Sequence, residues 1–327
     1  MDYAQPRSID GLVRRSLLIF PLNVQRFVDK AHLRGADCII MDLEDSVPEA
    51  EKESARGLVK ESIPLVGKGG GDVAVRINRP IGQATLDLEA SVWPGLTCVA
   101  LPKVESAEEV RVRSGIIEEL ERRRGIEAGT VQIAVAVETA LGVVKGFEIA
   151  SASPRIVTIQ VGAEDLTQEM GVQTSAEGRE LWYPRSKILM DAYAAGVQPI
   201  GLVGVEPFTW REPEKAYDAA VNSRSLGYKG AQSIHPAPIP YLNQGFSIPP
   251  EEAAFMRRAL KAFEEGLEEG TASVSVDGRM IDIASAERCK RVLARADAIA
   301  GMDERKREDM EDPDALEQRL RAAIDKV

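Results

Sequence analysis

Charged side chains follow several short apolar runs in this sequence, and two carboxylates among them are placed to do chemistry together. Glu138 directly follows the run 132–137, and Asp165 lies just after the run 156–161. Two carboxylates at the ends of adjacent strands, with no histidine close by in sequence, suit a hard divalent cation such as Mg²⁺. Alternatively, either acid caps the following helix or pairs with a surface base. For this pair we favour the metal site.

Arg76, which lies in the run 73–77, is the second candidate. A buried arginine at a strand end is costly unless it meets an anion, and its planar guanidinium matches a carboxylate through two parallel hydrogen bonds. An internal ion pair to Asp42 or Glu44 is nearly as good an explanation. Asp42, Glu44 and Asp45 either orient metal-bound water or cap a helix. Lys103 offers a Schiff base or an anion site, although most lysines at loop starts form neither.

Other common catalytic chemistries find little support. The only histidines are His32 and His235, which argues against a histidine-rich zinc site. No G-x-S-x-G motif is present, so a Ser-His-Asp triad is not expected. The cysteines are widely spaced and form no C-x-x-C pair, which is typical of packing residues in a reducing cytoplasm: Cys38, Cys98 and Cys289.

The charge balance limits the partners of the chain. The 327 residues include 41 Lys and Arg against 52 Asp and Glu, a net charge of −11. Nucleic acid and anionic membranes both require a cationic face, so neither is an expected partner. No apolar run approaches the ~20 residues of a membrane-spanning helix. We therefore expect a cytoplasmic protein that binds small molecules.

Eight short apolar runs position these residues, and helix-like segments separate them. The runs cover residues 16–20, 38–42, 73–77, 98–101, 132–137, 156–161, 200–205 and 231–234. Such a pattern is typical of parallel strands that are covered on both faces. Eight of these runs in about 230 residues favour an α/β fold, the (β/α)8 TIM barrel, with polar residues gathered at the carboxyl ends of the strands. A doubly wound sheet is the competitor, but no G-x-G-x-x-G follows any run.

The pattern changes near residue 246 and divides the chain. We expect an N-terminal extension over residues 1–13, a barrel with the metal and substrate site over 14–245, and a C-terminal appendage over 246–327. Pro249 and Pro250 begin a helix in the appendage, and Asp277 and Gly278 mark a turn within it.

Eight motifs together resemble the family of the citrate lyase β subunit, malyl-CoA lyase and citramalyl-CoA lyase. Each is weak alone, but they occur in the family's order and cover the chain from about residue 14 to about residue 295. The motifs are RSLLIFP (15–21), IMDLEDSVP (40–48), VRIN (75–78), LPKVE (101–105), VETA (137–140), GAEDL (162–166), IHP (234–236) and GRMID (278–282).

The resemblance implies a TIM barrel with a C-terminal helical lid, assembled as a homotrimer or homohexamer. The implied activity is a Mg²⁺-dependent carbon–carbon lyase that cleaves a malyl-CoA or citramalyl-CoA type of thioester to acetyl-CoA and a small 2-oxo acid. Glu138 and Asp165 would hold Mg²⁺, or Mn²⁺, and Arg76 would bind the oxo-acid carboxylate. Asp282 matches an acid that relatives place over a neighbouring subunit's barrel, where it would act as the general acid or base.

The resemblance also places Arg26 and Lys30 where relatives meet coenzyme A phosphates. Three nearby positions depart from the family's pattern, namely Leu22, Val24 and Ala231. Rival functions are an acyl-CoA thioesterase, a Schiff-base aldolase and a non-catalytic subunit that binds acyl-CoA.

Overall fold

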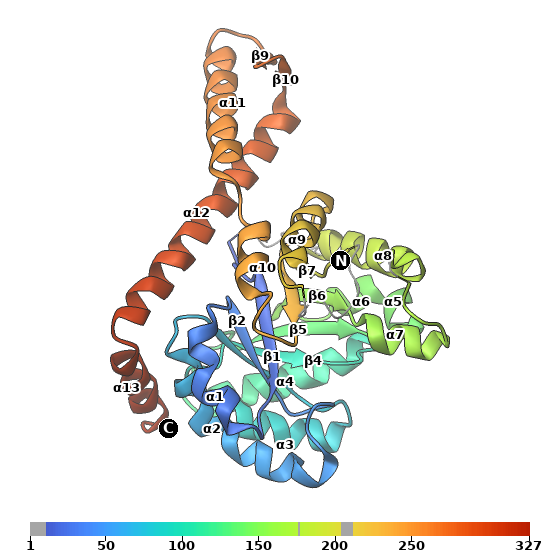
Figure 1. The fold of residues 1–327 in the computed structure, drawn as a ribbon, viewed down its shortest axis with the longest axis vertical. Helices are drawn as coiled ribbons and strands as arrows, with labels where there is room; N and C mark the ends of the chain where they lie inside the picture. Colours follow the sequence, from blue (N-terminus) through green and yellow to red (C-terminus); the bar gives the residue numbers. More distant parts are fainter. Residues whose placement is uncertain (1–10, 176, 204–211) are drawn as a thin grey trace. The chain divides into compact units, whose positions relative to one another are not determined.

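Eight parallel strands form a barrel in the computed structural model, which describes residues 11–175, 177–203 and 212–327 (Figure 1). Each strand from β1 to β6 pairs with the next in sequence, and β8 pairs with β1. A bridge between Ile200 and Gly230 brings β7 and β8 together. The strands are β1 (Ser16–Pro21), β2 (Cys38–Asp42), β3 (Asp72–Arg76), β4 (Cys98–Leu101), β5 (Gln132–Val137), β6 (Ile156–Val161), β7 (Gln198–Ile200) and β8 (Ala231–Ser233).

The predicted TIM barrel is therefore confirmed, with one strand misplaced. Seven strands agree with the predicted runs to within one residue at either end. The predicted strand over 200–205 is wrong, because β7 covers Gln198–Ile200 and residues 201–203 are not in a strand. Residues 204 and 205 lie outside the described residues. Buried Gln198 and Pro199 break the apolar pattern at the true start of this strand.

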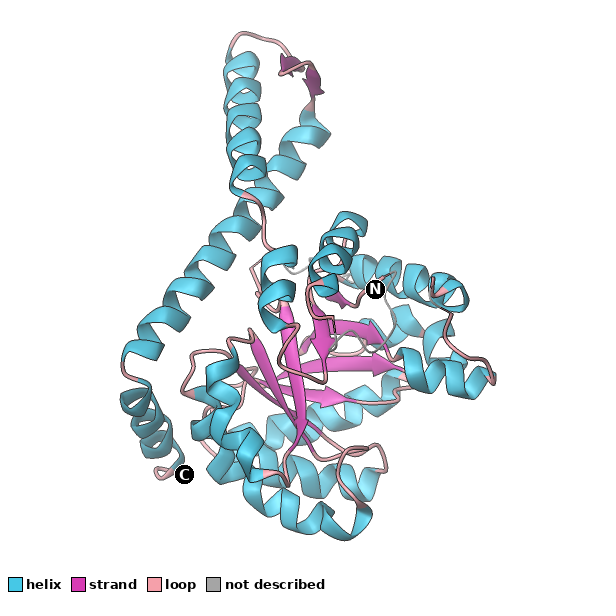
Figure 2. Cartoon of the chain, in the orientation of Figure 1, coloured by secondary structure: helices cyan, strands magenta, loops and turns pink. Residues whose placement is uncertain are grey.

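Helices surround the strands, as Figure 2 shows. Ser106 caps α4 by accepting a hydrogen bond from the Glu109 amide at 3.3 Å. The helices around the barrel are α1 (Gln25–Ala31), α2 (Lys52–Gly67), α3 (Ile81–Ser91), α4 (Ala107–Arg123), α5 (Ala140–Val144), α6 (Gly146–Ala150), α7 (Ala163–Met170), α8 (Trp182–Ala195), α9 (Lys215–Leu226) and α10 (Ile239–Phe246). Short 3₁₀ turns are η1 (His32–Arg34), η2 (Glu49–Glu51) and η3 (Arg179–Leu181).

The interior of the barrel is packed by side chains rather than open. Leu17, Ile40 and Cys98 belong to a buried apolar cluster that the strands contribute to the inside. Near the amino-terminal ends of the strands, the fully buried Arg14 guanidinium bonds Asp72 and Gln132, each at 2.8 Å. Among the described residues, these side chains fill the interior toward the amino-terminal ends of the strands. We therefore look for a ligand site toward the carboxyl ends.

The C-terminal residues divide between two compact units. Residues 14–246 and 306–327 form the first unit, and residues 247–305 with residues 11–13 form the second. The expected segment 246–327 is thus split, since α13 (Pro313–Ile324) packs against α2 and Lys306 donates to Asp37 at 2.9 Å. The second unit contains α11 (Pro250–Glu268), the hairpin of β9 (Val274–Val276) and β10 (Arg279–Ile281), and most of α12 (Ile283–Glu311). No helix in the described ranges combines the length and hydropathy needed to cross a membrane.

Candidate active site

A cavity of about 230 Å³ opens at the carboxyl ends of the barrel strands. Small apolar side chains from β4 and β5 form one wall, and polar or charged side chains from β3, β6, β8 and the following loops face it. The lining includes Ala100, Ala134, Ala136, Thr158, Gln160, Gln232, Arg76, Glu138, Glu164 and Asp165. The structure thus brings Arg76, Glu138 and Asp165 together, as the sequence predicted, at the face where TIM-barrel enzymes place their chemistry.

Glu138 is a buried carboxylate whose Oε2 has no hydrogen-bond partner among the described residues. Burial, with the nearby charges of Asp165 and Glu44, raises the pKa of Glu138 to about 8. Gly162 allows this position, because a Cβ there would lie 2.4 Å from the Glu138 Cγ. The side chain is therefore held where a cation, rather than a protein donor, would satisfy it.

Asp165 lies in the first turn of α7 and is partly exposed, with 37% of its side chain accessible. Its Oδ1 lies 3.5 Å from the Lys103 ammonium, which is the one ion-pair partner of this carboxylate among the described residues. Together the two carboxylates supply hard oxygen donors, which fit Mg²⁺ or Mn²⁺ with water and substrate completing the coordination. Within the described ranges, no three His, Cys, Asp or Glu side chains group as a metal site, so this pair has no third acidic ligand.

Arg76 makes the internal ion pair that the sequence left open. Its Nε and Nη2 donate to the two Asp42 oxygens at 2.6 and 2.7 Å, and Nη1 lies 3.1 Å from Glu44. Burial opposes charge on Asp42, but the bonds and charge of Arg76 outweigh it and lower the pKa of Asp42. The amides of Glu44 and Ser46 also donate to Asp42, at 3.0 and 3.1 Å. The guanidinium is therefore rigidly held, and three of its five N–H groups remain for Glu44 or a ligand anion.

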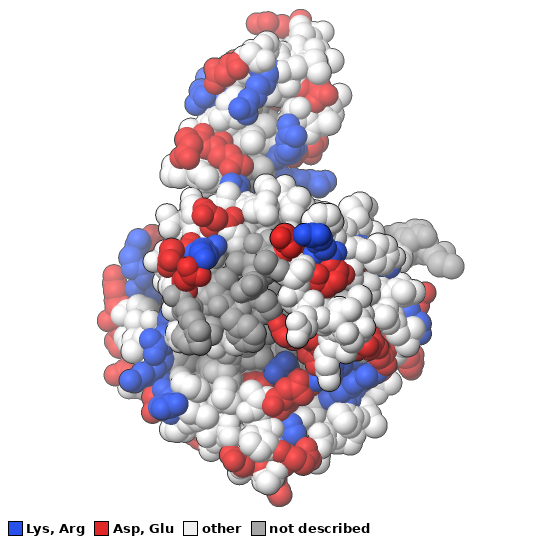
Figure 3. Space-filling model, turned by 45° about the vertical axis from the view of Figure 1, so that its right-hand side comes forward, with Lys and Arg blue, Asp and Glu red and all other residues white. Residues whose placement is uncertain are grey.

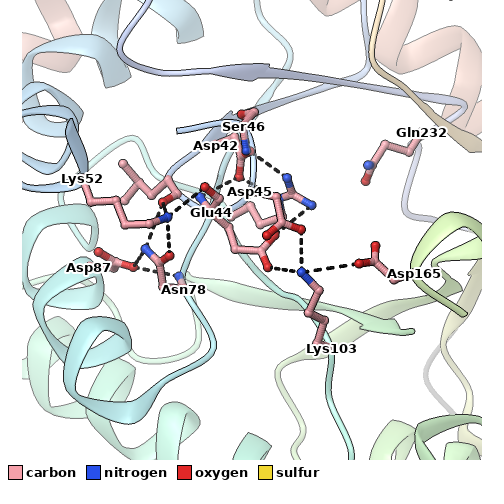
Figure 4. A network of polar contacts seen from close by, with 12 residues as sticks. Asp42, Glu44, Asp45, Ser46, Lys52, Asn78, Asp87, Lys103, Asp165 and Gln232 are labelled. Atoms are coloured by element: carbon pink, nitrogen blue, oxygen red, sulfur yellow. Dashed lines mark hydrogen bonds and ion pairs between the residues drawn. The ribbon is translucent and has the colours of Figure 1, made fainter. Parts of the chain in front are cut away.

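Lys103 lies at the centre of an acidic network, shown in Figure 4. Its ammonium donates to Glu44 at 2.7 Å and to Asp45 at 2.5 Å, in addition to the contact with Asp165. Burial opposes this charge, but Asp45 and Glu44 outweigh it and raise the lysine's pKa. A Schiff base needs an uncharged amine, so the aldolase alternative for Lys103 conflicts with its surroundings. The backbone φ of Lys103 is 50°, which is unusual for a residue other than glycine. Such backbone conformations occur often at functional sites.

A second polar layer supports the loop that carries Asp42, Glu44 and Asp45. Lys52, from α2, donates to the carbonyls of Leu43 and Glu44 at 3.0 and 2.9 Å and to Asn78 at 2.7 Å. The Asn78 amide nitrogen in turn donates to Asp87 at 2.8 Å (Figure 4). Lys52 and Asp87 were not predicted as site residues, because both lie in helices, where charged side chains are usually solvated. Asn78 lies within the VRIN motif, and this motif was the one sequence feature that pointed to it.

The match to a known family comes from the same part of the chain. The sequence model of HpcH/HpaI aldolase/citrate lyase matches residues 15–236, which include Arg76, Lys103, Glu138 and Asp165. The chain belongs to this family. The resemblance read from the eight motifs is thereby confirmed.

Individual relatives of the HpcH/HpaI family agree along most of the chain. Citrate lyase subunit beta of Leuconostoc mesenteroides subsp. cremoris is 35% identical over 290 residues, which cover 88% of this chain and 94% of that protein. A (3S)-malyl-CoA thioesterase of Cereibacter sphaeroides is 30% identical over 289 residues, covering 88% and 95%. The structure of protein CitE from Mycobacterium tuberculosis, in complex with magnesium, acetoacetate and coenzyme A, has a TM-score of 0.66 and 29% identity, covering 88% of this chain and 99% of that chain. The chain is a lyase of this CoA-related family, as predicted.

Asp282, the predicted acid or base, belongs to the second unit and not to the barrel unit. It lies between β10 and α12, where its Oδ1 accepts a hydrogen bond from the Ser285 amide at 2.8 Å. This bond lowers the pKa of Asp282, so the group is a carboxylate at neutral pH. A capping role is therefore present, and a chemical role stays a prediction.

The predicted coenzyme A positions lie on α1, which follows β1. Arg26 and Lys30 are both exposed on this helix. Leu22 and Ala231, which depart from the family's pattern, are almost fully buried and pack within apolar clusters. These two side chains contribute packing and are not available to a phosphate. On the face drawn in Figure 3, the described acidic and basic residues are interspersed.

Proposed function

We propose that this lyase is Mg²⁺-dependent and cleaves a 3-hydroxy-3-carboxyacyl-CoA thioester, reversibly, to acetyl-CoA and a 2-oxo acid. The observation that carries the proposal is the buried Glu138 Oε2, which has no hydrogen-bond partner among the described residues and lies in one cavity with Asp165 and Arg76. At about 230 Å³, this cavity is smaller than the ~300–1,000 Å³ typical of pockets for drug-sized ligands. Its size suits the small-acid half of the substrate, and the coenzyme would extend outward past α1.

The roles of the residues follow from this arrangement. Arg76 would hold the substrate carboxylate and fix its orientation, because Asp42 already orients the guanidinium. Glu138 and Asp165 would hold the metal. When bound, Mg²⁺ or Mn²⁺ supplies Lewis-acid stabilisation of charge on the oxygen of the carbon that is cleaved. Arg26 and Lys30 would bind the phosphates of coenzyme A, since buried Leu22 and Ala231 do not.

We assign proton transfer to Asp282. In the condensation direction it would remove a proton from the methyl group of acetyl-CoA, whose carbon then attacks the oxo acid. In cleavage it would return that proton to the enolate. A carboxylate at neutral pH suits the base role. As the resemblance implies, Asp282 would come from a neighbouring copy in a homotrimer or homohexamer, with residues 247–305 of the second unit as the lid; light scattering tests that assembly.

The test uses acyl-CoA substrates of the malyl, methylmalyl, citramalyl and citryl type, with trapping of the released oxo acid. We expect Mg²⁺-dependent cleavage that EDTA abolishes and that Asp165→Ala eliminates. Full activity in Asp165→Ala would refute the metal assignment. Asp282→Asn is a sharp second variant, because asparagine caps a helix as well as aspartate does. It should leave unfolding unchanged while turnover falls by about 100-fold or more.

Thioester hydrolysis is the second candidate, favoured by the 30% identity to a (3S)-malyl-CoA thioesterase. The same assay separates the two activities. A hydrolase releases free coenzyme A without accumulating acetyl-CoA, whereas a lyase accumulates acetyl-CoA and oxo acid in equal amounts. Binding of acyl-CoA with neither product would instead indicate a non-catalytic subunit. We also propose a cytoplasmic location, which the three free, buried cysteines support.

A further inference from the structure

Two glutamines form a neutral polar patch inside the cavity that the proposed mechanism does not use. Gln160 comes from β6 and Gln232 from β8, and the Gln160 Nε2 donates to the Gln232 Oε1 at 3.1 Å. Both line the cavity that contains Arg76 and Glu138. Figure 4 shows the Gln232 side chain apart from the hydrogen-bonded carboxylate network around Lys103.

Most of the hydrogen-bonding capacity of the two amides is unused. Each amide has two N–H donors and one carbonyl acceptor, and their mutual bond uses one donor and one acceptor. Among the described residues, neither side chain makes another hydrogen bond. Two donors of Gln232, one donor of Gln160 and the Gln160 Oε1 therefore remain for water or a ligand. A ligand that covers them with an apolar group loses those bonds, which disfavours it about tenfold or more.

The charges of the cavity indicate which polar group fits. Arg76 is the basic residue of the lining, whereas Glu138, Glu164 and Asp165 are acidic. The carboxylate next to the carbonyl of the oxo acid, together with that carbonyl, would occupy both Mg²⁺ and Arg76. A second carboxylate would then have no cationic partner among the described lining residues, and burying it against two neutral amides is costly. A hydroxyl group, which both donates and accepts, matches the amide pair without adding charge.

Building on the proposed function, we propose that Gln160 and Gln232 select a 2-oxo acid with a hydroxyl group on the carbon next to its carbonyl. The acid end lies at Arg76, the carbonyl lies between Glu138 and Asp165, and the hydroxymethyl group meets the amide pair. Hydroxypyruvate represents this class. Pyruvate lacks the hydroxyl, glyoxylate lacks the whole substituent, and oxaloacetate replaces the hydroxyl group with a carboxylate.

The experiment compares these four acids on the full chain. Binding is measured by calorimetry with Mg²⁺, and condensation with acetyl-CoA is measured by loss of the thioester. The variants are Gln160→Leu and Gln232→Leu, which keep side-chain volume nearly constant. Gln83→Leu is the control, because Gln83 lies on α3, outside the cavity, where its side chain donates to Glu49. The ratio of two ligands on one preparation does not depend on the fraction of protein that is folded.

We expect the wild-type protein to favour hydroxypyruvate over pyruvate by about tenfold or more in both binding and kcat/KM. Each cavity variant should lower the hydroxypyruvate-to-pyruvate ratio by about tenfold, because affinity and kcat/KM fall for hydroxypyruvate and stay the same for pyruvate. Gln83→Leu should leave the ratio unchanged. A wild-type preference for pyruvate, glyoxylate or oxaloacetate overturns the inference, as does an unchanged ratio in both cavity variants. If the wild-type protein binds and condenses none of the four acids, the proposed function itself fails.

Discussion

The assignment of Glu138 as a Mg²⁺ ligand predicts that magnesium affinity depends on pH, and the pKa of Glu138 sets the size of the effect. Burial and the charges of Asp165 and Glu44 raise that pKa to about 8. A protonated carboxyl does not bind the cation, so apparent affinity follows the deprotonated fraction. That fraction is about 1% at about pH 6 and about half at about pH 8, which predicts roughly a 50-fold rise in affinity across this range.

Calorimetric titration with Mg²⁺ measures both the affinity and the protons released. Below about pH 7, close to one proton should leave for each ion bound, and above about pH 9 almost none. Glu148→Gln removes an exposed glutamate on α6 and should reproduce the wild-type curve. Constant affinity between about pH 6 and about pH 8, or binding at about pH 6 without proton release, would refute the assignment of Glu138 as a ligand.

The same pKa has a consequence for unfolding of the metal-free protein. Because the folded state binds the Glu138 proton more tightly than the unfolded state does, this group lowers stability as pH rises from 4.5 toward about 8. The slope is about 1.4 kcal/mol per pH unit, and the full cost is about 5 kcal/mol at most. In urea titrations with EDTA, Glu138→Gln should therefore gain stability over wild type as pH rises through this window. If wild type and Glu138→Gln have equal free energies of unfolding at both pH 4.5 and about pH 8, the raised pKa of Glu138 is contradicted.

Three further predictions test the surroundings of Glu138. Arg76→Lys keeps the charge but loses the planar fork, so kcat/KM in the trapping assay should fall by about 100-fold; an unchanged value would exclude bidentate binding. Gly162→Ala adds a Cβ 2.4 Å from the Glu138 Cγ and should weaken Mg²⁺ binding in calorimetry by about tenfold or more, whereas Gly115→Ala, with nothing within 4 Å, should not. Borohydride with pyruvate should leave Lys103 unmodified in mass spectrometry, and a trapped adduct would show that its amine is uncharged in the working site.

The barrel could be predicted because its signal is periodic and local. Seven apolar runs match strands to within one residue, and the segments that end β3, β5 and β6 bring Arg76, Glu138 and Asp165 to the cavity. The exception is β7, which consists of Gln198, Pro199 and Ile200. Its first two residues lack the apolar, β-branched character of a strand, so the apolar run 200–205 begins only at its last residue. Pairing between parallel strands also explains why Glu138 and Asp165, 27 residues apart, converge.

The support of the site could not be predicted, because it depends on contacts between distant elements. Lys52 lies at the start of α2 among charged residues, a pattern typical of a solvent-exposed helix. Its ammonium nevertheless donates hydrogen bonds to two carbonyls of the loop after β2. Likewise, Lys103 has a left-handed backbone and its ammonium pairs with Glu44 and Asp45 of the loop after β2 and with Asp165 of α7. Sequence patterns report burial and periodicity, and they carry no information on such pairings.

The distribution of charge within the site explains where a cation is needed. Arg76 engages both oxygens of Asp42, and Lys103 engages Glu44 and Asp45, so these acids are balanced by the protein itself. Lys103 reaches Asp165 only at 3.5 Å, and Glu138 Oε2 has no partner in the described part of the chain. A protein base here would remove the cost of burying Glu138, but it would also occupy the cavity. Leaving Glu138 without such a base keeps the space open, and the same feature that lowers stability would give the proposed metal site its affinity for a cation.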